Sequence, residues 1–412
     1  LFAHRPGRAF IGLVIAAFLP MHLYLYHYPT NETLSATLCT ASIYLALRLL
    51  RNRKERVGVY ALLGLVLGLA MLAKVPALLV LASVTMVLAG RLVVRRTRVS
   101  VAVACLGTML AVCLGVCGWH YARVTMHFGT PFVGHWHEAL GFHMWQDPGY
   151  QTSGYFLRFG QSILDPLFAG FATLPDGLYS TMWGDGLIGS AAGQWYFVPW
   201  RLEPMTAGYL LAIVPLAMML IGGVVMLTSL VRRPRAAWFL LLGLTFGMAM
   251  ALVSLNLRMP TYAHAKAFFS LSAIVFAVAA AGLGYEVLSR RGRTVRIVVT
   301  ALLGLWAANA CITFWIADDA RSHARLGRLA LEVDGDRDLA RRELDRALRI
   351  DPENLSALIG HASLQVRANE YDQAQATLER ASQHHGDQPE LMMKLAQFAA
   401  TRGRIDEAIE QL

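Results

Sequence analysis

The sequence predicts an all-α protein, in which a polytopic bundle of transmembrane helices precedes a solenoid of helical repeats. Three observations lead to this prediction. Apolar residues make up 56% of the 412-residue chain, and its mean hydropathy of +0.46 is high for a soluble protein. Basic clusters separate long apolar stretches over the first 300 residues. From about residue 321 the composition turns charged and repeats with a period of 34 residues.

Nine apolar stretches are long enough to cross a bilayer as helices, since hydrocarbon offers backbone polar groups no other partner. They cover about 9–27, 34–50, 57–73, 76–94, 99–118, 206–231, 236–255, 263–288 and 297–316. The third and fourth are separated by Lys74-Val-Pro76. Merging them would move the following basic cluster to the opposite side of the membrane, so we treat them as two spans.

The basic clusters set the orientation, because Lys and Arg stay preferentially on the cytoplasmic side. Four clusters fall at connections that share one side: Arg51–Arg56, Arg91–Arg98, Arg232–Arg235 and Arg290–Arg296. We therefore expect an integral protein of the bacterial inner (plasma) membrane. The connections 28–33 and 119–205 and the region 321–412 are then extracytoplasmic. These clusters account for the net charge of +10, so nucleic acid is not an expected partner.

The long connection 119–205 is too long for an ordinary loop and indicates a functional segment. It is rich in tryptophan, and the residues near 119–121 and 195–200 are expected to anchor the chain at the membrane interface. The apolar stretch Tyr155–Phe171 contains Arg158 and Asp165, which favours a helix lying in the interface over a tenth span.

The last 92 residues, 321–412, carry small and apolar residues at a spacing of 34. The aligned positions are Ala340, Ala374 and Ala408; Leu344, Leu378 and Leu412; and Ala347 and Ala381. This pattern resembles tetratricopeptide repeats, each a pair of helices. The resemblance implies a groove that binds a protein or glycan partner, with a spacer as the alternative. The third repeat stops at Leu412, so we expect a cut or an incomplete array.

Polar residues occur at the predicted outer ends of several spans. Asn31 and Glu32 open the second span, Lys74 ends the third, and Arg258 and Lys266 flank the connection before the eighth. A cation at this depth is costly unless it meets an anion, which favours contact with a lipid-borne phosphate. Alternatively, the cations reach interfacial water or pair with Glu32. Glu32 could bind an acceptor, hold a metal or cap its helix.

Several motifs occur in an order that resembles a known superfamily. They are Tyr28-Pro-Thr-Asn31-Glu32, then Gly64-(three residues)-Gly68-Leu-Ala-Met-Leu-Ala-Lys74, then Gly177-Leu-Tyr-Ser-Thr-Met-Trp183-Gly-Asp185-Gly, and the segment Tyr262–Lys266. The order is similar to that of polyprenyl-phosphate-dependent glycosyltransferases of the GT-C superfamily, such as protein O-mannosyltransferases and lipid A aminoarabinosyltransferases.

The resemblance implies transfer of a sugar, with inversion, from a polyprenyl-phosphate-linked donor to an extracytoplasmic acceptor. Lys74, Arg258 and Lys266 would contact the donor phosphate, and Asn31, Glu32, Trp183 and Asp185 would contact the acceptor or sugar. In that superfamily the catalytic acidic residue lies in the first external loop. We expect that loop upstream of Leu1, in an N-terminally truncated chain, so no catalytic residue is assigned.

The sequence identifies no cofactor with certainty, and a divalent metal stays open. His135-Trp-His137-Glu138, with His143 beyond, has a spacing that suits a loop, but a third firm ligand is missing. All five cysteines fall in predicted spans, so they form no disulfide framework. We expect Cys113 and Cys117 to pack on a helix surface rather than to hold a metal.

Two other functions stay open. An oligosaccharide transferase of the O-antigen-ligase type would rely on Arg and His residues of the large external loop, such as Arg158 and Arg201. A non-enzymatic, membrane-anchored tetratricopeptide scaffold would use the spans only to hold the repeats. The polar residues at the outer helix ends, Glu32 and Lys74 above all, favour the glycosyltransferase over both.

Overall fold

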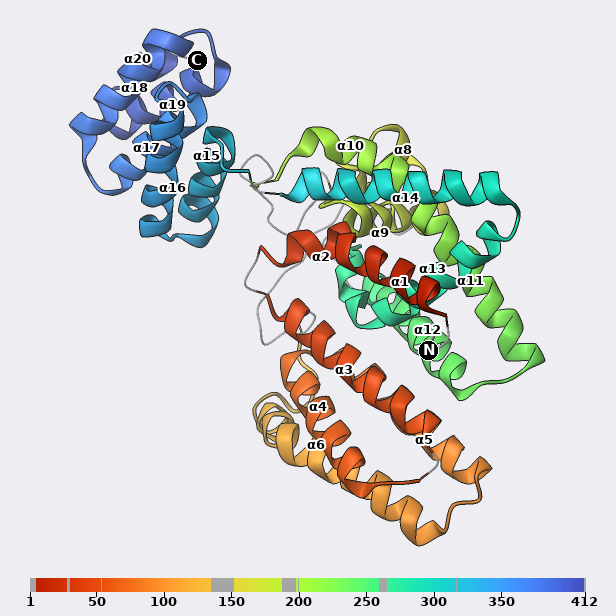
Figure 1. Ribbon diagram of the computed structural model, residues 1–412. Coiled ribbons are helices and arrows are strands. Elements are labelled where there is room, and N and C mark those ends of the chain that lie inside the picture. Colours follow the sequence, from red (N-terminus) through yellow and green to blue (C-terminus); the bar gives the residue numbers. More distant parts are fainter. Residues whose placement is uncertain are drawn as a thin grey trace. The chain divides into compact units, whose positions relative to one another are not determined.

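In the computed structural model, the structure describes residues 5–27, 30–52, 54–134, 152–186, 198, 200–258, 265–315 and 317–410. Every regular element in these ranges is a helix (Figure 1). The chain forms two compact units, Leu1–Gly189 with Pro204–Cys311, and Ser190–Glu203 with Ile312–Leu412. The division therefore differs from the predicted boundary near 318, because a short segment before the sixth predicted span belongs with the repeats.

Within the described ranges, seven helices are long and apolar enough to cross a membrane. They are α3 (Asn31–Arg51), α5 (Ala77–Val94), α6 (Val99–Phe128), α10–α11 (Leu202–Leu211 and Ile213–Arg232), α12 (Ala236–Arg258), η5–α13 (Ala267–Ala273 and Ile274–Ser289) and α14 (Arg293–Phe314). Two shorter apolar helices, α1 (Pro6–Phe18) and α4 (Val57–Ala73), correspond to the other two predicted spans. The predicted all-α fold, an integral membrane bundle followed by repeats, is confirmed.

Two predicted boundaries differ from the structure for identifiable reasons. The first span is divided into α1 and α2 (Pro20–Leu25) at Leu19, whose backbone is extended, since Pro20 has no N–H to continue a helix. In contrast, α6 continues for ten residues beyond 118 to Phe128 and ends at Gly129, whose φ of 72° makes a left-handed cap. The long connection therefore begins later than predicted.

Glycines allow the helices of the first unit to pack closely. In hydrocarbon the hydrophobic effect contributes little to helix association, so small residues that permit backbone contact become important. A Cβ atom at Gly64 of α4 would lie 2.2 Å from the Met109 carbonyl oxygen of α6. At Gly222 of α11 it would lie 1.7 Å from the Ala280 carbonyl oxygen of α13. These two helix pairs are therefore fixed by backbone contact.

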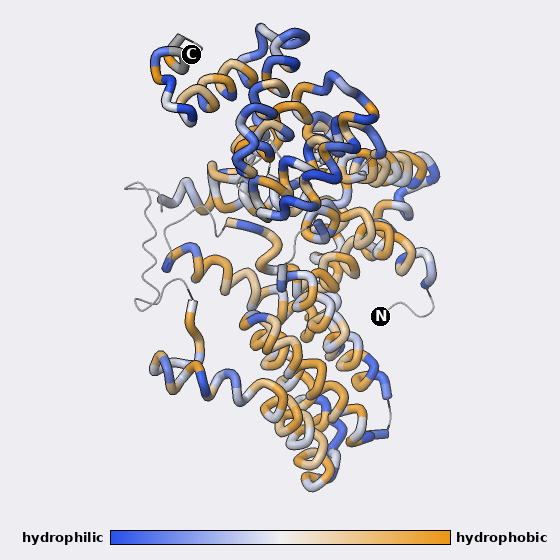
Figure 2. The backbone as a smooth tube through the Cα atoms, turned by 90° about the vertical axis from the view of Figure 1, so that its left-hand side faces the viewer, coloured by the Kyte–Doolittle hydropathy of each residue, from blue (hydrophilic) through white to orange (hydrophobic). Residues whose placement is uncertain are grey.

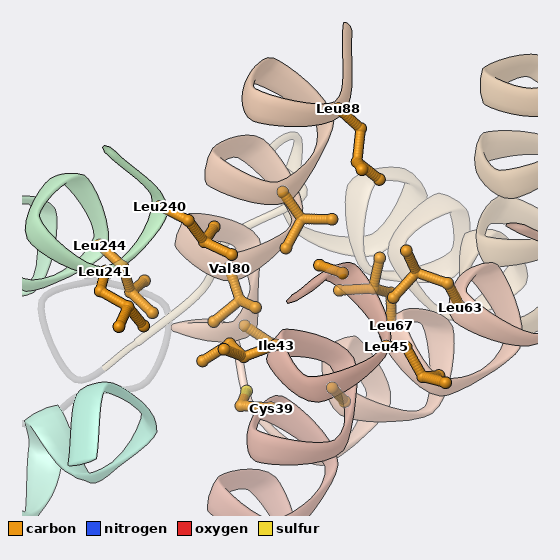
Figure 3. Close-up of a cluster of buried hydrophobic side chains, with 14 of the residues drawn as sticks. Cys39, Ile43, Leu45, Leu63, Leu67, Val80, Leu88, Leu240, Leu241 and Leu244 are labelled. Atoms are coloured by element: carbon orange, nitrogen blue, oxygen red, sulfur yellow. The ribbon is translucent and has the colours of Figure 1, made fainter. Parts of the chain in front are cut away.

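Around these contacts, α3, α4, α5 and α6 share one apolar core with part of α12 and α13. Figure 3 shows several of its side chains, from Cys39 and Ile43 of α3 to Leu240, Leu241 and Leu244 of α12. Cys113 and Cys117 are buried in this core, in agreement with their predicted packing role. The spans of the first unit are mostly hydrophobic along their length, whereas hydrophilic and hydrophobic residues are mixed along the repeat helices (Figure 2).

The described part of the long connection forms short helices, namely α7 (Ser153–Leu157), α8 (Gln161–Leu164), η2 (Ala169–Phe171) and α9 (Leu174–Trp183). The prediction of one interfacial helix over Tyr155–Phe171 is wrong. Gly160 and Phe168 have φ values of 138° and 58°, in a region that interrupts a right-handed helix.

The second unit contains the repeat helices. These are α15 (Ala320–Leu329), the π-helical turn η6 (Ala330–Asp334), α16 (Arg337–Ile350), α17 (Leu355–Arg367), α18 (Tyr371–His385), α19 (Pro389–Thr401) and α20 (Ile405–Glu410). The aligned residues that the structure describes are buried, as predicted: Ala340, Leu344, Ala347, Ala374, Leu378 and Ala381. The side chains of Ala408 and Leu412 lie outside the described residues.

The segment before α10 packs within this second unit. Trp200 is fully buried, and its ring lies 5.7 Å from that of Phe314. The Arg325 side chain donates to the Trp200 carbonyl over 2.8 Å. The prediction that Trp200 anchors at a membrane interface is therefore wrong, because its ring is part of a protein interior.

Candidate functional site

The sequence-predicted residues Lys74 and Glu32 form an ion pair between the end of α4 and the beginning of α3. Thr30 caps α3, and its hydroxyl accepts a hydrogen bond from the Glu32 N–H over 2.9 Å. Glu32 thus lies in the first turn, where a helix N-terminus favours negative charge. The two side chains are only 21% and 10% exposed. Lys74 thus pairs with Glu32, which is one of the alternatives that the sequence left open.

Asn31 strengthens the same junction. Its side-chain amide donates to the Ala73 carbonyl over 3.1 Å, which satisfies one of the carbonyl groups left unpaired at the end of α4. Neighbouring residues of α3 therefore bind the end of α4 in two ways, through a hydrogen bond from Asn31 and an ion pair from Glu32.

Lys266 lies at the same aromatic pair as Lys74. The Lys74 ammonium is 4.8 Å from the centre of the Phe269 ring, and that of Lys266 is 5.8 Å from the centre of the Phe268 ring. The two rings are 4.7 Å apart. Both contacts are within the range of cation–π attraction. The structure thus gathers Asn31, Glu32, Lys74 and Lys266 around the start of η5, and we call these four residues the Lys74 site.

Arg258 is not brought into this site by any contact among the described residues. It is the last residue of α12 and is exposed, and the following residues 259–264 lie outside the described part of the chain. Two residues earlier, Asn256 is buried and accepts a hydrogen bond from the Tyr155 hydroxyl over 3.1 Å. This bond ties α7 to the end of α12.

Trp183 and Asp185 belong to a second, buried group at the end of α9. Each is only 1% exposed. The Trp183 ring lies 5.8 Å from that of Trp306 in an edge-to-face arrangement, and the backbone N–H of Asp185 lies 3.5 Å from the Met205 sulfur. Within α9, the Thr181 hydroxyl accepts a hydrogen bond from the Ala267 N–H over 2.8 Å, which joins this helix to η5 beside Lys266.

An apolar groove of about 810 Å³ runs between α9, α11, α12 and η5–α13. Its lining is almost entirely hydrocarbon and includes Trp183, Leu216, Leu220, Val224, Met248 and Leu252. Ala267 and Ser270, on either side of Phe268 and Phe269, also line it. The groove therefore extends from the helix that carries the aromatic pair along the apolar faces of the spans. Sequence reasoning missed it because its walls come from segments far apart in the chain.

Asp176 is a buried carboxylate that sequence reasoning also missed. Its Oδ1 accepts hydrogen bonds from the N–H groups of Gly160 and Ser162 over 3.2 and 2.8 Å. Its Oδ2 accepts one from the Thr173 hydroxyl over 2.9 Å. The signal was available in Thr173-Leu-Pro-Asp176, which has the spacing of a capping box. These satisfied bonds indicate that Asp176 organises the loop.

The remaining residues considered in the sequence come from the long connection. His135, His137, Glu138 and His143 lie outside the described residues. Arg158 is exposed.

Arg201 belongs to the second unit, where it forms an ion pair with Asp319 over 3.1 Å.

Charged residues of the repeats form a separate set of contacts. His323 lies between two carboxylates, with its Nε2 2.8 Å from Asp318 and its Nδ1 2.6 Å from Glu343. The hydrogen bonds from His323 and then Arg346 lower the pKa of the Asp318 carboxyl below its usual value.

Ion pairs also join the first helices of different repeats. Arg328 of α15 pairs with Glu390 of α19, and Arg367 of α17 pairs with Glu332 of η6, each over 2.6 Å. The second pair connects helices that the repeat pattern places side by side, whereas the first reaches across a whole repeat.

The comparisons with known proteins support the repeats alone. Residues 334–391 match the model of the tetratricopeptide repeat family, which confirms the repeat prediction there, and no glycosyltransferase family is detected. No curated protein and no solved structure matches the chain. The chain is thus an integral membrane protein that carries tetratricopeptide repeats, which suggest protein binding.

Proposed function

We propose that this protein is a membrane glycosyltransferase that moves a sugar from a polyprenyl-phosphate donor to an extracytoplasmic acceptor. One observation carries the proposal: two lysines, Lys74 and Lys266, flank an aromatic pair on η5, and the same helix lines an apolar groove. A prenyl chain requires an apolar surface, and its phosphate requires a cation at the membrane interface.

The ion pair supports an anion-binding role for Lys74. A lysine at this depth needs a negative partner, and Glu32 supplies one when no donor is bound. A donor phosphate would compete with Glu32 for the ammonium group. The carboxylate would then be available to a hydroxyl of the sugar or acceptor, with Asn31 beside it.

The reaction breaks the bond between the sugar C1 and the phosphate oxygen and forms a bond from C1 to the acceptor oxygen. The acceptor proton passes to a general base, to which we assign no residue. Negative charge develops on the departing phosphate, and cations aimed at it stabilise the transition state. Lys74 and Lys266 would supply this charge, and Arg258 is a third candidate. Trp183 would contribute to the groove wall and Asp185 to a sugar contact.

The repeats would bind a protein or glycan partner that brings the acceptor. Tetratricopeptide repeats stack helix pairs into an extended surface suited to such binding. The repeat match also favours a second candidate function, a non-enzymatic membrane-anchored scaffold. An O-antigen-ligase-type transferase is less well supported, because Arg201 already pairs with Asp319.

The two candidates differ in what the Lys74 site binds. The test uses the purified protein in nanodiscs and measures binding of polyprenyl monophosphate against uncharged polyprenol. We expect Lys74→Met to weaken binding of the phosphate form about tenfold or more, as for loss of a charge-assisted contact, and to leave polyprenol binding unchanged. Arg235→Met, which removes an exposed charge before α12, is the matched control.

Equal binding of the two lipids, or equal loss in both variants, would contradict the proposal and favour the scaffold. Where binding behaves as expected, transfer from a panel of polyprenyl-phosphate sugars is measured next with the same two variants. Lys74→Met should lower transfer, and Arg235→Met should not.

A further inference from the structure

The ends of α3, α4, α5 and α6 that lie away from the Lys74 site form a basic surface. The proposed function does not use this surface. Here Arg91, in the last turn of α5, binds the α3–α4 connection. Its guanidinium donates to Glu55 over 2.8 Å and to the Asn52 carbonyl over 2.7 Å. Arg95 donates to the same carbonyl over 2.6 Å. Asn52 of the α3–α4 connection thus binds Arg91 in the last turn of α5 and Arg95 directly after that helix.

This surface carries far more positive than negative charge. The stretches 48–57 and 91–100 contain nine basic residues and one acid, Glu55. Glu55 is already paired with Arg91 and Arg95. The exposed basic residues in the described part of these stretches are Arg48, Arg51, Lys54, Arg56, Arg95, Arg96 and Arg98. Their charge is therefore left largely uncompensated by the protein.

Apolar side chains are exposed beside these cations. Val93, Val94 and Val99, at the end of α5 and the start of α6, are 76%, 83% and 77% exposed. At the end of apolar spans, exposed arginines thus lie beside exposed valines. Such a surface suits both the headgroup and the acyl chains of a lipid. The valines contact acyl chains and the guanidinium groups contact phosphates.

Arg96 has a backbone conformation that favours glycine. Its φ is 52°, and the turn around it is closed by hydrogen bonds from Thr97 N–H to the Leu92 carbonyl and from Arg96 N–H to the Val93 carbonyl. This is the helix-ending turn in which glycine is usual and a side chain is strained. An arginine at this position indicates that its charge is of use.

Arg91 adds a second unusual feature. Its side chain is only 4% exposed, and its Nε atom is buried without a hydrogen-bond partner among the described residues. The preference of basic residues for the cytoplasmic side explains the sign of the charge. That preference does not explain why a buried arginine of α5 binds the α3–α4 connection. It also does not explain the strained backbone of Arg96.

We propose that the surface formed by residues 48–52, 54–56 and 91–98 binds the phosphate of an anionic phospholipid headgroup. Arg91 and Arg95 fix the shape of the surface through Asn52 and Glu55. Arg96 and its exposed basic neighbours supply the contacts to phosphate, in the planar geometry that arginine offers. The binding lies at the end of the spans opposite the Lys74 site and is independent of sugar transfer.

The test measures the thermal midpoint of unfolding, Tm, of the purified protein in uncharged detergent while lipid is added. A ligand that binds the folded state raises Tm with its concentration. We expect phosphatidylglycerol to raise Tm and phosphatidylcholine and inorganic phosphate to have little effect. Raising the salt concentration should reduce the shift, because exposed charges are screened.

Arg96→Gly separates binding from folding, since it removes the charge and relieves the strained turn. Without lipid this variant should unfold at the same or a higher temperature, whereas about fivefold more phosphatidylglycerol should be needed for the same shift. Arg96→Lys keeps the charge and should retain most of the binding. Arg233→Gln removes a charge from another basic cluster on the same side and should respond to lipid as the parent protein does.

Three results would overturn the proposal. An unchanged lipid response in Arg96→Gly would remove Arg96 from the site. An equal loss in Arg233→Gln would show attraction by overall surface charge instead of a site. A shift with inorganic phosphate equal to that with phosphatidylglycerol would identify the ligand as free phosphate and not a lipid.

Discussion

Lys74 and Glu32 are 42 residues apart in the sequence and form an ion pair that joins α4 to α3. The pair lies at the ends of both helices, where the side chains are mostly shielded from water. A neighbouring aromatic ring of η5 lies 4.8 Å from the ammonium group. Three segments distant in sequence thus meet at one charged contact, and we propose that its cation binds an anionic ligand.

This contact predicts a specific coupling in stability. Glu32→Gln removes the carboxylate and leaves the Lys74 ammonium poorly solvated. We expect the free energy of unfolding to fall by about 1–3 kcal/mol, less than for a fully buried pair because water reaches part of the site. The double variant Glu32→Gln/Lys74→Met should be no less stable than Glu32→Gln alone. Chemical unfolding of all four proteins in detergent gives the coupling, and strictly additive losses would contradict it.

The contact between α11 and α13 predicts that Gly222 does not tolerate a methyl group. In Gly222→Ala the new Cβ atom would lie 1.7 Å from the Ala280 carbonyl oxygen, so the helices must separate. We expect a loss of about 1–3 kcal/mol in unfolding free energy. Gly243→Ala in α12 is the control, because its Cβ would meet nothing within 4 Å. Tm measurements that rank the two variants equally would argue against the close contact.

The buried Asp176 should be needed for loop structure. Asp176→Ala removes the acceptor for hydrogen bonds from Gly160, Ser162 and Thr173. Leaving buried donors unpaired costs about 1–3 kcal/mol each, with some relaxation, so we expect faster proteolysis within 152–186 and a lower Tm. Asp165→Ala, at an exposed residue of the same segment, should leave both unchanged. Equal cleavage of the two variants would show that Asp176 does not hold the loop.

The repeats should lose a stabilising contribution in acid. Hydrogen bonds from His323 and then Arg346 lower the pKa of Asp318 below its usual 3.8. A carboxyl whose pKa is lower in the folded state stabilises fully above its unfolded pKa, and this contribution disappears as pH falls through the folded pKa. The Tm difference between the parent and Asp318→Asn should therefore be largest at neutral pH and shrink below about pH 3.8. A difference that is constant with pH would contradict this.

The sequence was sufficient to predict the helices, because long apolar runs and a fixed repeat period depend on local composition. The predicted span 57–73 coincides with α4, and the aligned alanines and leucines of the repeats are buried. Errors occurred where single residues decide the backbone. Pro20 divides the first span, and Phe168, at a φ of 58°, interrupts the expected interfacial helix.

The candidate site was predictable only in part. Lys74 and Glu32 could be singled out because charge at a span end is costly wherever it occurs. The contact of Lys74 with Phe269 depends on how η5 packs against α3, which hydropathy does not encode. The apolar groove and the hydrogen bond from Arg91 to the Asn52 carbonyl likewise depend on tertiary packing.

The central claim is one of orientation: the Lys74 site and the repeats face away from the cytoplasm, and the basic surface that contains Arg96 faces toward it. Cysteines introduced at Asn31, Ile350 and Arg98, all exposed residues, can be labelled with a membrane-impermeant maleimide. The background is low once Cys311 is replaced by serine, because the other four cysteines are buried. In sealed right-side-out vesicles we predict labelling at 31 and 350, and at 98 only after permeabilisation. Labelling of 350 only after permeabilisation, or of 98 in sealed vesicles, would contradict the orientation and with it the proposed sugar transfer.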